Sequence, residues 1–131
     1  MSITVRAATD ADRADVVRHA DSCTEECRTY RGDLPKPGAR SLVALVDGHT
    51  VGSISWDDAD SVVTVGHLFV DTDARSVGVG AALLTALMDD SRRAGRRHLS
   101  CAVQPGNRNM KNLLERLGII AMAIRTGVDL V

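Results

Sequence analysis

Aromatic residues are scarce in this chain, and charge of neither sign is in excess. Phenylalanine, tryptophan and tyrosine occur once each among 131 residues, as Phe69, Trp56 and Tyr30. The formal net charge is -1 at pH 7, so no overall field attracts nucleic acid or an acidic membrane. We therefore expect no nucleic acid and no membrane among its partners, since three aromatic side chains also offer little for stacking on bases.

Long apolar runs and a cysteine framework are missing as well. No stretch approaches the roughly 20 apolar residues that a membrane-spanning helix needs, and the N-terminus has no apolar segment like that of a signal peptide. Cys23, Cys27 and Cys101 form an odd set without framework spacing, which suits a reducing compartment. These features predict a cytoplasmic protein, and the length of 131 residues predicts a single domain over residues 1–131.

Strand and helix signals alternate along the chain. Strands are predicted over residues 3–7, 41–46, 50–56, 61–70, 99–103, 119–124 and 128–131, and helices after Thr9 and over residues 79–94 and 107–117. Turns are predicted at 47–49 and 57–60, and Val16, Val17 and Ala20 are expected to face inward from the first helix. This order predicts an α/β or α+β sheet with helices on its faces.

The most informative segment precedes the long second helix. There Arg75-Ser76-Val77-Gly78-Val79-Gly80 leads directly into the helix. Gly78 and Gly80 lack a Cβ atom, so a bulky anion can approach the backbone closely. The first helical turn has unpaired N–H groups and the positive end of the helix dipole, and Arg75 adds a positive charge. These features predict a phosphate-binding loop, although a glycine-softened turn without a ligand has the same spacing.

Two other nucleotide-binding motifs fail on their residues. A dinucleotide-binding fingerprint needs a third glycine at the position where Leu83 stands. It also needs an acidic residue about 20 positions further on, where the sequence has Arg96, Arg97 and His98. A Walker loop needs a Gly-Lys-Ser/Thr ending, which the sequence lacks. Neither motif is therefore expected to act here.

With these residues in view, the sequence resembles the GNAT superfamily of N-acetyltransferases. Members carry an Arg/Gln-x-x-Gly-x-Gly/Ala loop after their fourth strand, and Arg75 to Gly80 matches it. A second match, Asn107-x-x-Met110-x-x-Leu113-x-x-x-Leu117-Gly118, is similar to the family's exit from the fifth strand and its last helix. Val5 to Asp12 is similar to the family's opening strand and helix, so the resemblance extends over nearly the whole chain.

The resemblance implies a fold, an activity and a coenzyme site. The expected fold is α/β (α+β), with a mixed, mostly antiparallel central sheet and helices on both faces. The expected activity is acetyl-CoA-dependent transfer of an acetyl group to a primary amine, by direct attack on the thioester in a cleft where the fourth and fifth strands splay apart. A backbone N–H near Phe69 or Val70 is expected to stabilise the oxyanion. The expected coenzyme-binding residues are Phe69, Val70, Arg75, Ser76, Val77, Gly78, Val79, Gly80, Ala81 and Asn107.

The catalytic groups are where the sequence departs from the family. Many members place a tyrosine in the last helix as the general acid, and Leu114 stands at that position. Many also have a titratable group on the fourth strand, where His67 is the only one among residues 62–68. His67 is the candidate for proton transfer, with a hydrogen-bonded histidine outside the cleft as the other interpretation. Tyr30 lies near the expected substrate loop and is the candidate for contact with the acceptor.

Two further patterns favour structural interpretations. His19, Cys23 and Cys27 recur every four residues, but no clear fourth ligand accompanies them, so no metal is expected. The arginines from Arg92 to Arg97 follow the end of a helix whose dipole they complement, which favours a solvated helix end over a nucleic-acid site.

The missing tyrosine and carboxylate leave a second function open, a non-catalytic acyl-CoA-binding or regulatory domain of the same family. For the enzyme, the acceptor is expected to be a protein lysine, an N-terminus or a small amine. Dimers are frequent in the family, so a homodimer is an expectation that no residue here decides.

Overall fold

The computed structural model describes residues 2–122 and 125–130. Strands and helices alternate through this part of the chain, as the sequence predicts. In order they are β1 (Ile3–Ala7), α1 (Arg13–Cys27), β2 (Arg40–Val46), β3 (His49–Ala59), β4 (Val62–Val70), α2 (Val79–Arg93), β5 (His98–Ala102), α3 (Arg108–Arg116), β6 (Ile120–Met122) and β7 (Arg125–Asp129). Short 3-10 turns over Asp10–Asp12 and Thr72–Ala74 lead into α1 and into the loop before α2.

One sheet contains these strands, in the order β1-β2-β3-β4-β5-β7-β6. Neighbouring strands are antiparallel except for β4 and β5, which run parallel. The parallel pair follows from the connection, because α2 carries the chain back along the sheet between β4 and β5. The fold is therefore α/β with a mixed, mostly antiparallel central sheet, which confirms the prediction.

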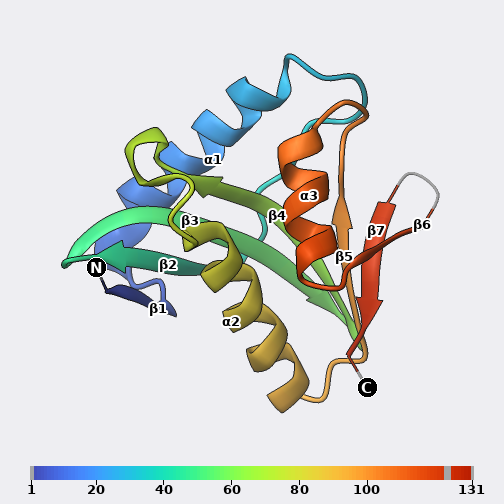
Figure 1. Ribbon diagram of the computed structural model, residues 1–131. Helices are drawn as coiled ribbons and strands as arrows, with labels where there is room; N and C mark the ends of the chain where they lie inside the picture. The colour runs from blue at the N-terminus through green and yellow to red at the C-terminus, as the bar shows by residue number, and fades with distance from the viewer. Residues whose placement is uncertain (1, 123–124, 131) are drawn as a thin grey trace.

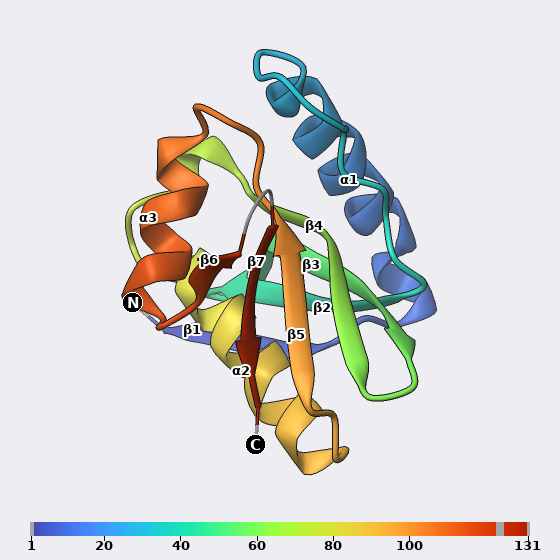
Figure 2. The same cartoon turned by 90° about the vertical axis from the view of Figure 1, so that its right-hand side faces the viewer.

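Helices cover both faces of this sheet, again as predicted. α1 packs against β3 and β4, whereas α2 packs against β1 to β4. Figures 1 and 2 show α1 on one side of the sheet and α2 with α3 on the opposite side. The side chains buried on the two faces of the sheet differ in polarity, and this difference bears on where the candidate site residues lie.

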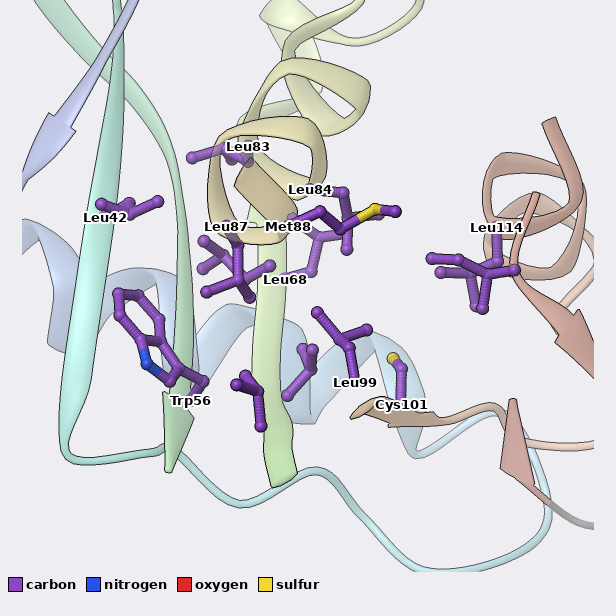
Figure 3. Packing of buried hydrophobic residues seen from close by; sticks show 14 of the residues in the cluster. Leu42, Trp56, Leu68, Leu83, Leu84, Leu87, Met88, Leu99, Cys101 and Leu114 are labelled. Carbon is purple, nitrogen blue, oxygen red and sulfur yellow. The ribbon is translucent and has the colours of Figure 1, made fainter. Parts of the chain in front are cut away.

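The apolar core lies between α2 and the sheet (Figure 3). Leu83 and Leu87 of α2 are fully buried and are four residues apart, so they lie on one face of the helix. They belong to the same cluster as Ile54 of β3 and Leu99 of β5, and Leu114 of α3 joins it. Burying a side chain of this size stabilises the fold by roughly 2 kcal/mol, so this layer holds α2 and its N-terminus rigidly on the sheet.

β4 contains one extra residue relative to β3, and this bulge reverses the side-chain alternation. Val65 is paired with Trp56 and Leu68 with Ile54, so three steps along β4 match two along β3. Val65 and Leu68 both belong to the core on the α2 side. His67, between them, lies on the α1 side, where it is bonded to a serine that also contacts α1. A bulge thus decides the orientation that strand alternation left open.

Two sequence expectations are wrong in detail. The turn predicted over residues 57–60 is part of β3, because Asp58 pairs with Val63 and the strand continues to Ala59. Val17 was expected to face inward, but 53% of its surface is exposed. The buried face of α1 contains Ala20, as predicted, together with His19 and Cys23, since a helical period allows more than one phase and the sheet selects one of them.

The last two predicted strands, over residues 119–124 and 128–131, correspond to β6 and β7. β7 begins at Arg125, earlier than predicted, because it pairs with β5 up to Ala102. The parts of these predictions that fall on residues 123, 124 and 131 lie outside the described residues.

Candidate functional site

The site begins where β4 and β5 separate. Their pairing runs only from Val62 with His98 to Val65 with Cys101, while β4 continues to Val70 beside β3. The end of β4 therefore has a strand on one side and an open edge on the other. Figure 1 shows that this edge lies between α1 and α3.

A cleft of about 1340 Å³ borders this open edge. It is lined by the end of α1 and the residues after it, the end of β4, the segment leading into α2, and α3. Most of the predicted coenzyme and substrate residues line it, namely Tyr30, Phe69, Val70, Arg75, Ser76, Gly78, Val79, Gly80, Ala81 and Asn107. Val77 borders a neighbouring cavity of about 790 Å³ instead, and neither of these cavities is lined by His67.

The loop before α2 opens onto the cleft because of its backbone conformation. Gly78 is the N-cap residue of α2 and has a φ of 95°, a left-handed value that side chains disfavour. A Cβ atom at Gly78 would meet nothing within 4 Å, so the space in front of it is open. The first backbone bond of α2 runs from the Ala82 N–H to the Gly78 carbonyl. The N–H groups of the turn before Ala82 therefore have no carbonyl within the helix to bond, which suits a phosphate group.

Gly80 has a different reason to be glycine. A Cβ atom there would lie 3.2 Å from Cδ2 of Leu113 on α3. The absence of a side chain lets the first turn of α2 approach α3 closely. Gly78 thus leaves open space in front of the loop, whereas Gly80 permits contact between α2 and α3. The spacing of the two glycines in the sequence does not distinguish these roles.

Val70 directs its peptide groups toward the open edge. Next to it, the Asp71 N–H donates to the Val51 carbonyl at 2.7 Å. Gly52 stands opposite Val70, and antiparallel strands alternate between pairs that exchange hydrogen bonds and pairs that do not. The Val70 N–H therefore points away from β3, and its carbonyl accepts a hydrogen bond from Nε of Arg75 at 2.8 Å on that side.

The positive charge of Arg75 is matched by a carboxylate from α1. Its two terminal nitrogens donate to the Glu26 carboxylate at 2.8 and 2.6 Å, and its guanidinium lies 5.2 Å from the centre of the Phe69 ring. The pairing raises the pKa of Arg75 above its usual value. Glu26 also lines the cleft. The sequence offered no signal for this contact, because the two residues are 49 positions apart.

Asn107 and Leu114 show how α3 borders the cleft. The Asn107 side chain accepts the Met110 N–H at 3.2 Å, so it caps the helix at the cleft wall. Leu114, at the position where the family often has its tyrosine, is fully buried in the core. The side chain at that position therefore supplies no acid and contacts apolar groups.

His67 belongs to a buried polar layer beneath α1. Its ring nitrogens lie 2.8 Å from Oγ of Ser53 and 2.7 Å from Oγ of Ser55. Ser53 in turn lies 2.8 Å from Nδ1 of His19. Burial, aided by the nearby His19, lowers the pKa of His67 to about 4. The ring is thus neutral near pH 7 and bonded to two serines, and its proposed part in proton transfer stays a prediction.

The α1 wall, the side of the cleft formed by α1, carries the predicted substrate residue Tyr30 and two cysteines that sequence reasoning did not place there. Tyr30 follows α1 and lies near the turn before α3, since a Cβ atom at Gly106 would be 3.6 Å from its ring. Cys23 and Cys27 line the cleft with it, and burial raises the pKa of Cys23 to about 12. Within the described ranges, no group of three or more histidine, cysteine or acidic side chains is arranged to hold a metal ion.

The open edge of β4 and the N-terminus of α2 border the same cleft, an arrangement that suits a phosphate-bearing ligand. Residues 7–119 match the acetyltransferase (GNAT) family, and the chain belongs to this family. It is therefore an N-acetyltransferase whose cofactor is acetyl-CoA and whose substrate is an amine. None of the curated proteins matches the chain.

Solved structures share the fold at low sequence identity. The structure of yncA from Salmonella typhimurium, with its cofactor acetyl-CoA, is 18% identical at a TM-score of 0.80, over 100% of this chain and 95% of that one. The ribosomal-protein-S18-alanine N-acetyltransferase of Escherichia coli is 16% identical at a TM-score of 0.77, over 98% and 94%. The IAA acetyltransferase of Bacillus cereus is 15% identical at a TM-score of 0.77, over 98% and 99%. No helix in the described part of this chain is long and apolar enough to cross a membrane.

Proposed function

We propose that this acetyltransferase moves the acetyl group to a primary amine by direct attack of the amine on the thioester. The observation that carries the proposal is the cleft, which joins the N-terminus of α2 to the open edge of β4. Acetyl-CoA bound there supplies a thioester carbonyl that is already reactive. Holding the two reactants in line then provides much of the acceleration.

The proposed coenzyme site uses the backbone more than side chains. The N–H groups of the first turn of α2 bind the pyrophosphate, and Gly78 leaves room for it. The Val70 N–H is the better donor to the oxyanion than that of Phe69, because Phe69 pairs with Ser53 of β3. The full proposed set is Phe69, Val70, Arg75, Ser76, Val77, Gly78, Val79, Gly80, Ala81 and Asn107.

Proton transfer is proposed to depend little on an acid of the chain. A thiolate whose thiol has a pKa of about 8.5 is a tolerable leaving group, so the buried Leu114 does not prevent the reaction. The amine needs to lose a proton. His67 is neutral near pH 7, as a base must be, but its serine partners would have to release the ring.

The second function, a non-catalytic acyl-CoA-binding domain, is favoured by the burial of Leu114 and by the serine-bonded state of His67. Turnover decides between the two. We expect acetyl-CoA and free CoA to raise the melting temperature, an oligonucleotide to leave it unchanged, and thiol release to exceed hydrolysis with some members of a primary-amine panel. Tight coenzyme binding without amine-dependent thiol release would establish the binding domain instead.

Several finer points belong to the same proposal. The acceptor is a protein lysine, an N-terminus or a small amine, and Tyr30 contacts it at the α1 wall. The chain forms one domain over residues 1–131 and acts in the cytoplasm, where its cysteines stay reduced. A homodimer is compatible with this picture, and light scattering of the purified chain measures it.

A further inference from the structure

Glu26 and Arg75, which both line the cleft, form an ion pair between α1 and the loop before α2. Glu26 stands in the last turn of α1, and Arg75 opens the loop that leads to α2. Two hydrogen bonds of 2.8 and 2.6 Å join them side by side, while the third guanidinium nitrogen is bonded to the Val70 carbonyl. Both side chains remain partly exposed, at 38% for Arg75 and 47% for Glu26, so either one can exchange partners.

The geometry of this pair is also the geometry of phosphate recognition. A guanidinium presents the same planar fork to a carboxylate and to a phosphate. Arg75 lies next to Ser76 and Gly78, at the N-terminus of α2 whose dipole already favours an anion. A pyrophosphate bound at that N-terminus carries more negative charge than one carboxylate and is held by several N–H groups. The pyrophosphate therefore competes with Glu26 for the two terminal nitrogens of Arg75.

When the Arg75 guanidinium turns to the pyrophosphate, the Glu26 carboxylate is left in the cleft without its paired cation. Of the two acidic residues that line the cleft, Glu115 pairs with Lys111 on α3 at 3.8 Å, whereas Glu26 lies on α1. A primary amine near neutral pH is an ammonium ion, which a carboxylate without a paired cation attracts. Glu26 would thus be free to bind a cation once the coenzyme holds Arg75.

We infer that Glu26 binds the ammonium group of the acceptor, and that Arg75 blocks this site until the coenzyme pyrophosphate draws the guanidinium away. The inference rests on the proposed transfer to an amine. The competing explanation is that the ion pair is a structural brace, which only holds α1 against the loop. In that case, removing the Glu26 carboxylate should weaken coenzyme binding rather than tighten it.

A binding cycle tests the competition without any turnover. CoA affinity is measured by calorimetry at low ionic strength for the wild type, Glu26→Gln, Arg75→Gln and the double variant, with Glu25→Gln as the control. Glu25 is on the same helix but pairs with Arg28 at the surface. We expect Glu26→Gln to tighten CoA binding roughly threefold to fivefold, the scale of an exposed ion pair, and to have no effect once Arg75 is Gln. Weaker or unchanged binding in Glu26→Gln would overturn the inference in favour of a brace.

The acceptor half is tested on an amine that the wild type acetylates. Glu26→Gln should raise its KM about tenfold, the scale of one lost charge-assisted bond, with little change in kcat. Glu26→Asp, which keeps the charge, should recover part of the loss, and an unchanged KM in Glu26→Gln would refute the role. If the wild type acetylates no amine, the proposed function fails, whereas the CoA cycle still decides whether Glu26 competes with the coenzyme.

Discussion

Gln104, between β5 and α3, is a buried side chain that lacks the bonding its burial calls for. Only 8% of its surface is exposed. Within the described residues, neither the nitrogen nor the oxygen of its amide has a hydrogen-bond partner. A buried amide without partners loses its hydration and gains nothing in return. The Asn107 N–H bonds to the Gln104 carbonyl, so the backbone at this point is held while the side chain is not.

We therefore expect Gln104→Met, which keeps the length of the side chain, to raise the free energy of unfolding by about 1 kcal/mol. Urea denaturation of the purified protein measures the change. Gln104→Glu serves as the control, because it places a charge at the same point and should lower stability. A loss of stability in the methionine variant would mean that the amide has a bonding partner in solution.

At the scale of elements, the contact between α2 and α3 links the fold to the proposed coenzyme site. Gly80 lets the first turn of α2 approach Leu113, and Leu114 on the next position of α3 anchors that helix in the core. The N-terminus of α2 therefore has α3 as a neighbour on one side and the cleft on the other. A side chain added at Gly80 has to extend either toward α3 or into the cleft.

Gly80→Val should weaken CoA binding by roughly fivefold or more, because overpacking here costs about 1 kcal/mol or more and crowds the proposed pyrophosphate loop. Calorimetry measures the affinity, and a melting curve shows whether the variant is folded. Adding Leu113→Ala removes the clash with α3 and separates the two causes. Recovered affinity in the double variant, or unchanged affinity in a folded single variant, would contradict the placement of the pyrophosphate beside Gly80.

At the scale of the whole molecule, the two faces of the sheet are held by different chemistry. The α2 face is an apolar core, whereas the α1 face buries His19, Ser53, Ser55 and His67 in one hydrogen-bonded layer. Burial, chiefly, lowers the pKa of both histidines. Acid should therefore loosen the α1 face before it affects the α2 face.

The sign of the pH effect follows from proton uptake. His67 has an ordinary pKa of 6.5 when unfolded and about 4 when folded, so between these values the unfolded chain binds more protons. The free energy of unfolding should fall by up to about 3 kcal/mol as the pH drops from 6.5 to 4, and His19 adds to it with the same sign. Urea titrations at several pH values measure the slope. The same slope in His67→Asn would assign the effect to other groups.

Local chemistry made much of the fold predictable. The hairpin at Asp47-Gly48 and the loop through Gly78 are set by residues that accept positive φ, so sequence alone indicates them. The apolar face of α2 is likewise predictable, because four-residue spacing acts within one helix. The facing of Val17 and the end of β3 are not predictable in this way, because they depend on which surface a segment pairs with.

The sequence by itself determined the family and the order of elements, and it predicts the coenzyme loop, because glycine conformation and helix polarity are properties of adjacent residues. Only the tertiary structure decided which groups surround that loop. The bulge in β4 turned His67 beneath α1, and the docking of α1 brought Glu26 to Arg75 across 49 positions of sequence. Side chains distant in the chain meet only when the sheet and its helices pack, so the charge balance of the cleft is a property of the folded molecule.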